Sequence, residues 1–249
     1  MAGGLALAGG LLAGVLSPLL AQPADLAPRQ IYQQTLPAVV WISNDKQHGS
    51  GWVYDVKAGL LITNAHVVAD AAEVRVHFPR RDGRGKLISE RDLYPAEAAV
   101  NAKVLHRDTA RDLALLQVPR CPPGTSTLRL AADEPDPGER VHLVGCPTGS
   151  ESLWVYSQGC VRQHLKFIER DEAGLSCRVM QTQLPGSAGE SGAPVVNDQG
   201  LLVGVHRGVF PEAQLLSLEI ALSEVRAFLA KALPKPSADA PVGPTPTER

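Results

Sequence analysis

The sequence carries little net charge. Its 24 basic and 26 acidic side chains leave a formal charge of −2 over 249 residues. A chain this close to neutral has no overall field that would draw it to nucleic acid or to an anionic membrane, so neither is expected as a partner through charge alone. A short basic patch is interpreted as a solvated loop rather than a binding site: Arg80, Arg81, Arg84 and Lys86.

Cysteine is scarce, and none of the four cysteines has the C-x-x-C spacing of zinc or thioredoxin-type sites: Cys121, Cys146, Cys160 and Cys177. An even number permits two disulfides in an exported protein, but the sequence alone does not give their pairing. Cys160 and Cys177 flank a polar turn, so a hairpin there would place them opposite each other. Buried free thiols are an equally weighted alternative.

The first 21 residues contain no charged side chain and are rich in Ala, Leu and Gly. This composition is typical of a secretory signal that is cut after Ala21, and residues 22–28 follow as a linker. We therefore expect a secreted or periplasmic protein. The alternative is an uncleaved membrane anchor, which would be the protein's contact with a membrane.

Short apolar runs separated by Gly and Pro turns fill most of the chain. The run at 74–78 alternates apolar and polar residues, as a half-buried strand does. Many such runs predict an all-β sandwich or barrel. A short helix is expected at 29–36 and an amphipathic helix at 223–233, which closes a domain of residues 29–233. The Pro-rich segment 234–249 is predicted to be a disordered tail.

Two of these strand boundaries carry side chains suited to proton transfer. His66 follows an apolar run, and a histidine titrates near working pH. Asp112 stands directly before the apolar run 113–118, where a partly buried carboxylate needs a hydrogen-bond donor such as a histidine N–H. Asp108 is interpreted as an exposed turn residue.

A third segment, 185–194, is dense in small residues around Ser191. Such a run before a strand can form a tight loop whose N–H groups point inward. The N–H groups of Gly189 and Ser191 are candidates for an oxyanion hole. In isolation this segment is equally typical of an ordinary Gly/Ser hairpin.

The chain order His66, Asp112, Ser191 makes the combination more specific than any part. It matches the order of chymotrypsin-like enzymes rather than that of subtilisins or α/β-hydrolases. An α/β-hydrolase would also need Gly at the position of Ala193 and a catalytic histidine well after the serine, whereas His206 is too close to Ser191 in the sequence.

Together these segments resemble the bacterial trypsin-like peptidases of the HtrA/Deg type, over about residues 29–229. The matching motifs are G-S-G-W-V at 49–53, T-N-A-H-V-V at 63–68, D-L-A-L-L at 112–116 and G-E-S-G-A-P at 189–194. The resemblance implies an all-β fold of two six-stranded antiparallel β-barrels with the active site between them. His66 and Asp112 would belong to the first barrel and Ser191 to the second.

The chain departs from the usual pattern of this family in three places. Glu190 stands where the family usually has Asn, and Ala193 where it has Gly. Neither change removes a catalytic group, and the Glu190 side chain is expected to face the cleft or solvent. A PDZ domain usually follows the protease, whereas a Pro-rich segment follows here, so PDZ-mediated peptide sensing is not expected.

The resemblance also bears on substrate choice. The strand at 203–208 lines the primary specificity pocket in such peptidases, and a histidine at His206 resembles the glutamyl endopeptidases. Ser187 would add a hydroxyl donor to the same pocket. These two residues imply cleavage after Glu or Asp. The alternative, weighted slightly higher, is that His206 packs within its strand beside an apolar pocket.

The predicted activity is therefore that of a serine endopeptidase, which hydrolyses proteins or peptides through an acyl-enzyme without a cofactor. The alternative from another class is a latent or inactive protease-fold module that binds or chaperones. No catalytic metal is predicted, because the remaining histidines lack acid or cysteine partners at ligand spacing: His48, His77, His106, His142 and His164. A structural calcium site stays open, and the oligomeric state is not indicated.

Overall fold

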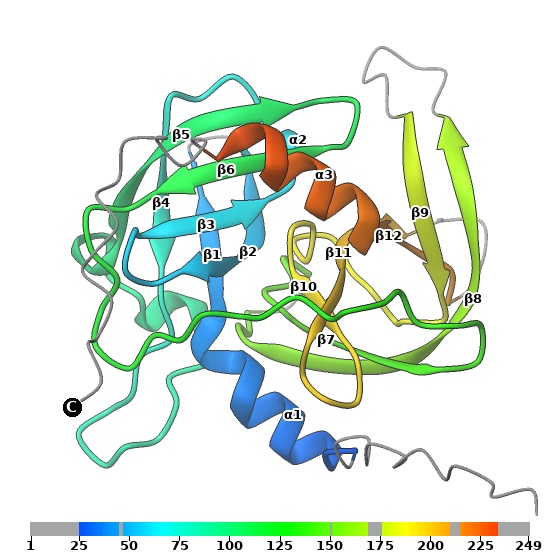
Figure 1. Cartoon of the computed structure of the whole chain (residues 1–249). Coiled ribbons are helices and arrows are strands. Elements are labelled where there is room, and N and C mark those ends of the chain that lie inside the picture. The colour runs from blue at the N-terminus through cyan, green and yellow to red at the C-terminus, as the bar shows by residue number, and fades with distance from the viewer. Residues whose placement is uncertain (1–24, 45–46, 150, 169–175, 210–214, 234–249) are drawn as a thin grey trace, which may run out of the picture.

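The computed structural model of the chain describes residues 25–44, 47–149, 151–168, 176–209 and 215–233. The predicted leader, the start of the linker and the Pro-rich tail lie outside these residues. Among the helices that the structure describes, none is both long and apolar enough to cross a membrane. The strands form two barrels that lie side by side (Figure 1).

The first barrel closes in the strand order β1-β2-β3-β6-β5-β4, and each neighbouring pair is antiparallel. Its strands are β1 (Val39–Ser43), β2 (His48–Asp55), β3 (Leu60–Thr63), β4 (Glu73–His77), β5 (Val100–Asp108) and β6 (Leu113–Gln117). The predicted alternation appears in β4, where Val74 and Val76 face the barrel core while Glu73 and Arg75 are exposed. The helix α2 (Ala65–Val68) follows β3 directly.

The second barrel closes in the order β10-β11-β12-β9-β8-β7, again with antiparallel pairs. Its strands are β7 (Arg140–Gly145), β8 (Val155–Ile168), β9 (Ser176–Thr182), β10 (Pro194–Val196), β11 (Leu202–Val209) and β12 (Ser217–Ala221). The predicted fold class, two six-stranded antiparallel barrels with a C-terminal helix, is confirmed.

Each barrel has a buried apolar cluster of its own, and a further cluster draws on both barrels. Trp52 and Ile62 of the first barrel belong to the same buried cluster as Val205 and Ile220 of the second. The helix α3 (Leu222–Ala232) adds the fully buried Phe228 to this cluster and contacts strands of both barrels. Because burial of large apolar side chains is the main stabilising term in folding, this core fixes how one barrel faces the other.

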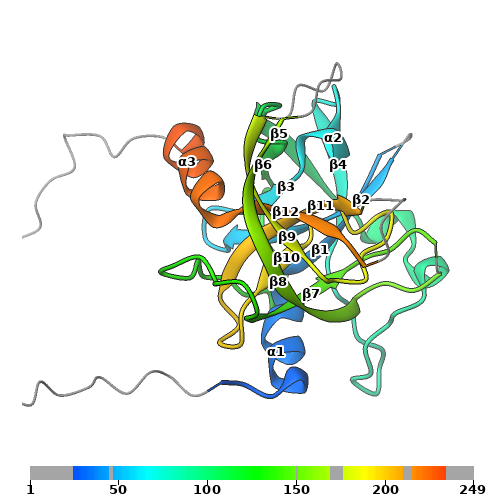
Figure 2. The same ribbon diagram turned by 90° about the vertical axis from the view of Figure 1, so that its right-hand side faces the viewer.

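The shorter helices lie at the ends and loops of the barrels. Helix α1 (Pro28–Thr35) begins one residue before the predicted position, with Pro28 in the first turn, where a missing N–H breaks no helical hydrogen bond. Figures 1 and 2 place α1 at one end of the molecule and α3 against the outside of the barrels. Three 3₁₀ turns complete the described elements: η1 (Leu36–Ala38), η2 (Arg91–Leu93) and η3 (Ala96–Ala98).

The suggested pairing of Cys160 with Cys177 is wrong. The β8–β9 hairpin does form, but Cys177 lies opposite Phe167, whereas Cys160 lies opposite Gln183, seven residues away along β8. That separation is roughly 20 Å along a strand, far beyond the ~7 Å between Cα atoms that a disulfide can span. All four cysteines are free thiols, and three of them are buried.

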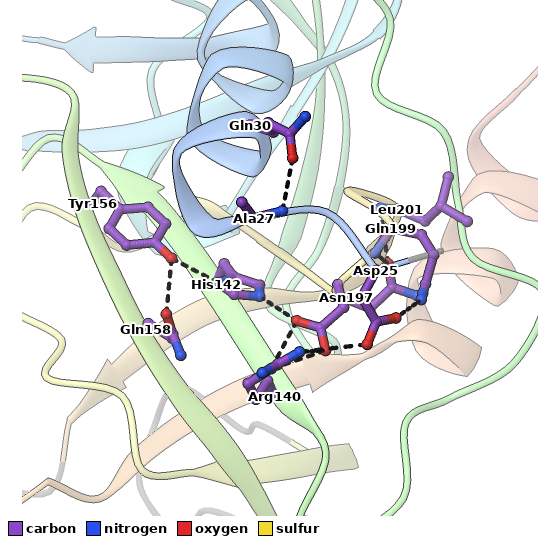
Figure 3. Close-up of polar contacts among 11 residues, drawn as sticks. Asp25, Ala27, Gln30, Arg140, His142, Tyr156, Gln158, Asn197, Gln199 and Leu201 are labelled. Atoms are coloured by element: carbon purple, nitrogen blue, oxygen red, sulfur yellow. Dashed lines mark hydrogen bonds and ion pairs between the residues drawn. The ribbon is translucent and has the colours of Figure 1, made fainter. Parts of the chain in front are cut away.

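A polar network holds the segment before α1 against the second barrel (Figure 3). Arg140 donates to both carboxylate oxygens of Asp198 and lies 3.4 Å from Asp25. The Leu26 N–H donates to the Asp198 carbonyl oxygen at 2.8 Å. Asp198 also contacts Nε2 of the buried His142 at 2.8 Å. Asp198 therefore joins the start of the fold to β7.

We expect Asp198→Asn to lower the Tm at neutral pH. Burial opposes ionisation of Asp198, but hydrogen bonds from Arg140 and His142 hold the pKa of its carboxyl below the ordinary value of 3.8. A depressed carboxyl pKa adds stability above that value, and the contribution is lost as the pH falls through the folded-state pKa. The Tm difference between Asp198→Asn and wild type, measured by scanning fluorimetry, should shrink as the pH falls from neutral to about 3.

Asp133→Asn, at an exposed position in the same surface hollow, is the control. A pH-independent Tm difference would contradict this account.

Candidate active site

His66 lies at the edge of the first barrel, on the short helix α2. Its N–H donates to Asp112 Oδ1 at 2.9 Å, and its ring Nδ1 lies 2.7 Å from Asp112 Oδ2. The His66 side chain is 42% exposed while that of Asp112 is 9% exposed. The imidazole is therefore held by a buried carboxylate on one edge and open to solvent on the other.

Asp112 lies in the turn between β5 and β6, in the left-handed backbone region with φ of +52°. Asn64 donates from its side-chain amide to the Asp112 carbonyl oxygen at 2.8 Å, which fixes this turn against the start of α2. Aspartate is among the non-glycine residues that adopt this region most readily. The turn therefore aims both carboxylate oxygens at His66.

The interpretation of Asp108 as an exposed turn residue is wrong. Asp108 is buried at the end of β5, but it bonds Arg111 rather than a histidine: its Oδ2 lies 3.0 Å from Arg111 Nη1. Lys231 on α3 lies 3.6 Å from the same oxygen. Asp108 therefore joins the β5–β6 turn to α3.

Ser191 lies in the loop between β9 and β10, on the second barrel. Its hydroxyl donates to the Arg207 carbonyl oxygen on β11 at 3.0 Å. In the part of the chain that the structure describes, no hydrogen bond joins Ser191 to His66. Arg207 also approaches the other end of the site, since its Nε lies 3.6 Å from Asp112 Oδ2. One β11 residue thus contacts both Ser191 and Asp112, a role that sequence reasoning missed.

The loop before Ser191 has the conformation expected of a tight turn. Gly189 has a φ of +88°, and a Cβ there would lie 2.6 Å from the Thr148 nitrogen and 2.8 Å from the Cys146 carbonyl oxygen. Only glycine fits such a close approach. The N–H groups of Gly189 and Ser191 donate to no acceptor among the described residues, so both are available as hydrogen-bond donors.

The expectation that Glu190 faces the cleft or solvent is wrong. Its side chain is 1% exposed and packs against Gly145, where a Cβ would lie 2.9 Å from Glu190 Cγ. Its Oε2 accepts the Ser187 N–H at 2.7 Å. Burial raises the pKa of the Glu190 carboxyl above its ordinary value, although the nearby His206 acts in the opposite direction.

The two residues predicted for the substrate pocket lie in different environments. Ser187 is exposed on the loop, whereas His206 is fully buried on β11. His206 Nδ1 lies 2.9 Å from Glu219 Oε2, and Glu219 Oε1 accepts from the Thr182 hydroxyl at 2.8 Å. Burial opposes protonation of His206, but the carboxylate of Glu219 raises its pKa above the ordinary value. The sequence signal for Glu219 was a carboxylate inside the otherwise uncharged run Ser217–Ala221.

The remaining histidines are placed by packing and pairing. His77 is buried and stacks on Trp41, and burial lowers its pKa to about 4. His164 lies 3.6 Å from Glu134, and His142 contacts Asp198. Among the described residues, no group of three or more His, Cys, Asp or Glu side chains is arranged to hold a metal ion.

A protein-family model described as a trypsin-like peptidase domain matches residues 49–205, which span β2 to β11 and include His66, Asp112 and Ser191. The chain belongs to the trypsin-like peptidase family. The matched region includes the loop with Ser191 and the strands of both barrels except β1 and β12, which lie outside it.

Curated relatives of this trypsin-like peptidase are serine proteases of the HtrA and Deg types. The mitochondrial serine protease HTRA2 of Bos taurus is 30% identical and aligns over 86% of this chain and 46% of its own length. A probable periplasmic serine endoprotease, DegP-like, of Ectopseudomonas mendocina is 28% identical over 73% of this chain and 35% of its own. The chain thus spans less than half the length of these relatives.

Among solved structures, the Rv3671c protease of M. tuberculosis in its active form aligns with a TM-score of 0.66 and 26% identity. The alignment covers 92% of this chain and 97% of that one. The same protease in its inactive form aligns with a TM-score of 0.65 and 25% identity. The two-barrel architecture of the peptidase family is therefore common to this chain and these neighbours.

We expect Gly192→Ala to destabilise the fold by more than its backbone conformation alone explains. Gly192 has a φ of +87°, and a Cβ there would clash with the Ser50 carbonyl oxygen and the Thr63 hydroxyl of the first barrel. Gly124→Ala is the matched control, because Gly124 has a φ of +86° and open space around it. The control should cost about 1–2 kcal/mol. Urea unfolding would measure both variants, and equal losses would show that the contact between barrels at Gly192 tolerates a methyl group.

Proposed function

We propose that this chain is a serine endopeptidase with His66, Asp112 and Ser191 as its catalytic triad. The observation that carries the proposal is the buried Asp112 carboxylate bonded to both the N–H and the ring of His66. That arrangement holds one imidazole tautomer and stabilises the imidazolium, which is the role of the acid in a triad. The relatives named as serine proteases support it.

In the proposed mechanism, His66 Nε2 takes the proton of Ser191 while Ser191 Oγ attacks the scissile carbonyl carbon. The N–H groups of Gly189 and Ser191 donate to the resulting oxyanion. His66 then gives its proton to the leaving amine as the C–N bond breaks, and an acyl-enzyme remains. Water, deprotonated by His66, releases the acid and restores Ser191. No cofactor takes part in these steps.

The Ser191–Arg207 hydrogen bond supports a resting state before this chemistry. The hydroxyl must leave the Arg207 carbonyl oxygen and turn to His66 before it can lose its proton. A latent protease, or an inactive protease-fold binding module, is therefore the second candidate function. The neighbouring Rv3671c protease is known in forms described as active and inactive, which favours latency over loss of activity.

We further propose that the chain has three parts: a leader or anchor with a linker over residues 1–28, a protease domain over 29–233 and a Pro-rich tail over 234–249. Protein or peptide substrates follow from the proposed endopeptidase activity. A periplasmic or secreted location follows from the apolar leader, and the periplasmic DegP-like relative supports it. Membrane attachment through an uncleaved leader is the alternative.

Labelling with a fluorophosphonate probe is the first test. We expect wild-type protein to be labelled and Ser191→Ala not to be, because the probe reacts with a serine activated by its base. Turnover should fall ~10⁶-fold in Ser191→Ala or His66→Ala, by analogy with other triads. Ser157→Ala on β8 should be labelled like wild type. Labelling that persists in Ser191→Ala would contradict the assignment of the nucleophile, and no labelling of wild type would favour the latent or inactive module.

Substrate preference is the second test. Glu219 already occupies His206 Nδ1, and Glu190 adds a second carboxyl beside the ring. The Glu219 carboxylate and the full burial of His206 oppose an acidic substrate side chain, whereas the exposed Ser187 and the remaining His206 Nε2 favour one. We expect peptides with Val before the scissile bond to be cleaved faster than those with Glu or Arg, as kcat/KM. Faster cleavage after Glu, lost in His206→Gln and reduced in Ser187→Ala, would instead establish the acidic pocket.

A further inference from the structure

Three buried ionisable side chains lie together behind the Ser191 loop. Glu190 comes from the loop itself, His206 from β11 and Glu219 from β12, and their exposed fractions are 1%, 0% and 0%. We call this group the buried cluster. Burying a charged group is costly unless it is hydrogen-bonded or paired. The partners of these three side chains therefore show how the buried cluster contacts the loop.

Glu190 is the member of the buried cluster that contacts the loop. Its Oε2 accepts the Ser187 N–H at 2.7 Å, and its own N–H donates to the Ser187 carbonyl oxygen at 3.2 Å. Its carbonyl oxygen accepts the Ala193 N–H at 2.8 Å. These three bonds close the turn on both sides of Gly189 and Ser191, which provide the proposed oxyanion donors.

His206 holds the other side of the same turn. Its N–H donates to the Ala193 carbonyl oxygen at 2.9 Å, and its carbonyl oxygen accepts the Gly192 N–H at 2.8 Å. Its ring packs under Gly186, where a Cβ would lie 2.5 Å from Cε1. Glu219 fixes that ring through Nδ1. The loop therefore rests on a histidine whose orientation a second carboxylate sets.

The charges of the buried cluster favour a neutral Glu190. The groups that face it are His206 on β11, Glu219 on β12 and Cys146 after β7. Burial raises the pKa of Cys146 to about 12, so this thiol is neutral. His206 and Glu219 form an ion pair. Burial and the charge of Glu219 raise the pKa of Glu190, whereas His206 lowers it, and the net shift is upward. A neutral carboxyl still accepts the Ser187 N–H through an oxygen.

We propose that Glu190 is a positioning residue: it holds the oxyanion-hole turn through its hydrogen bond from Ser187 N–H and its packing in the buried cluster, and it acts as an acceptor rather than as a charge. The proposal rests on the proposed function in that Ser191 is the nucleophile. It assigns a use to the acid that stands where related peptidases usually have Asn.

Two substitutions separate the acceptor from the charge. Glu190→Ala removes the acceptor, so we expect kcat to fall about 10- to 100-fold with little change in KM, as for a misplacement of about 1 Å in other enzymes. Glu190→Gln keeps an amide oxygen for Ser187 N–H and should recover most of that loss. The matched control is Glu134→Ala, which removes a carboxylate bonded to the Ser223 N–H at 3.0 Å, outside this site. The control should lower stability without lowering kcat.

The pH dependence of stability gives a second readout. Because the pKa of Glu190 is raised on folding, its contribution to stability is present below the ordinary value of 4.5 and is lost as the pH rises through the folded-state pKa. Glu190→Gln cannot ionise and escapes that loss. The Tm of Glu190→Gln relative to wild type should therefore rise from about pH 4 to neutral pH.

The outcomes distinguish this proposal from the proposed function. Equal kcat for Glu190→Ala and Glu134→Ala, or a Glu190→Gln variant as impaired as Glu190→Ala, would overturn the positioning role. If the wild type neither hydrolyses peptides nor reacts with the fluorophosphonate, the proposed function fails instead. Hydrogen exchange of the 185–193 amides then decides the positioning role: faster exchange in Glu190→Ala, restored in Glu190→Gln, supports it, and unchanged exchange overturns it.

Discussion

The contacts of Ser50 with the Ser191 loop are the interaction on which the rest of the site depends. Ser50 lies on β2 of the first barrel and is fully buried. Its N–H donates to the Ser191 carbonyl oxygen at 2.8 Å, and its hydroxyl donates to the Gly189 carbonyl oxygen at 2.9 Å and accepts the Cys146 N–H at 2.9 Å. His66 and Asp112 lie on one barrel and Ser191 on the other; the shared apolar cluster fixes how the barrels face each other, and the Ser50 bonds fix the Ser191 loop against β2. Each bond contributes about 1 kcal/mol net, but a broken one leaves a buried polar group unpaired at a cost of about 1–3 kcal/mol.

Three buried carboxyl groups surround this contact, and each is accommodated differently. Asp112 accepts two hydrogen bonds from His66, Glu219 pairs with His206 and Thr182, and Glu190 accepts a backbone N–H while burial favours its neutral form. Buried ionic groups add little net stability compared with apolar side chains of similar size. Their value here is geometric, since each positions a different part of the site. Asp112 orients His66, Glu219 orients His206 beneath the loop, and Glu190 holds the turn before Ser191.

Much of this arrangement was predictable from sequence, because it follows local pattern. Alternating strands and Gly-rich turns predict the barrels, and His66, Asp112 and Ser191 stand at strand boundaries where a chain leaves the core. The errors involve choices between two faces or two registers. Cys160 and Cys177 share a hairpin, but the register of the strand pair decides which residues meet across it, and the sequence alone does not give that register. Glu190 and Asp108 were expected to be exposed because charged residues in turns usually are; their partners, Ser187 N–H and Arg111, are visible only in three dimensions. Glu219 was missed because its partner His206 lies on the neighbouring strand.

The Ser191 hydroxyl donates to the Arg207 carbonyl oxygen at 3.0 Å, whereas the proposed mechanism requires it to donate to His66 Nε2. Leaving the Arg207 carbonyl oxygen for His66 Nε2 exchanges one hydrogen bond for another, each with a net worth of about 1 kcal/mol. A difference of ~1.4 kcal/mol corresponds to a tenfold change in population, so the two orientations differ by about tenfold or less if nothing else moves. We call the orientation in which the Ser191 hydroxyl donates to His66 Nε2 the engaged form. A substrate that binds the engaged form tenfold more tightly would then bring the two orientations to similar populations. The loop, by contrast, is held by backbone bonds to β11, by Ser50 and by Glu190, and its rearrangement would break several bonds at once. A resting state that differs from the engaged state only in the Ser191 side chain is therefore a small energetic step, whereas latency through a displaced loop would require an interaction strong enough to replace the whole set.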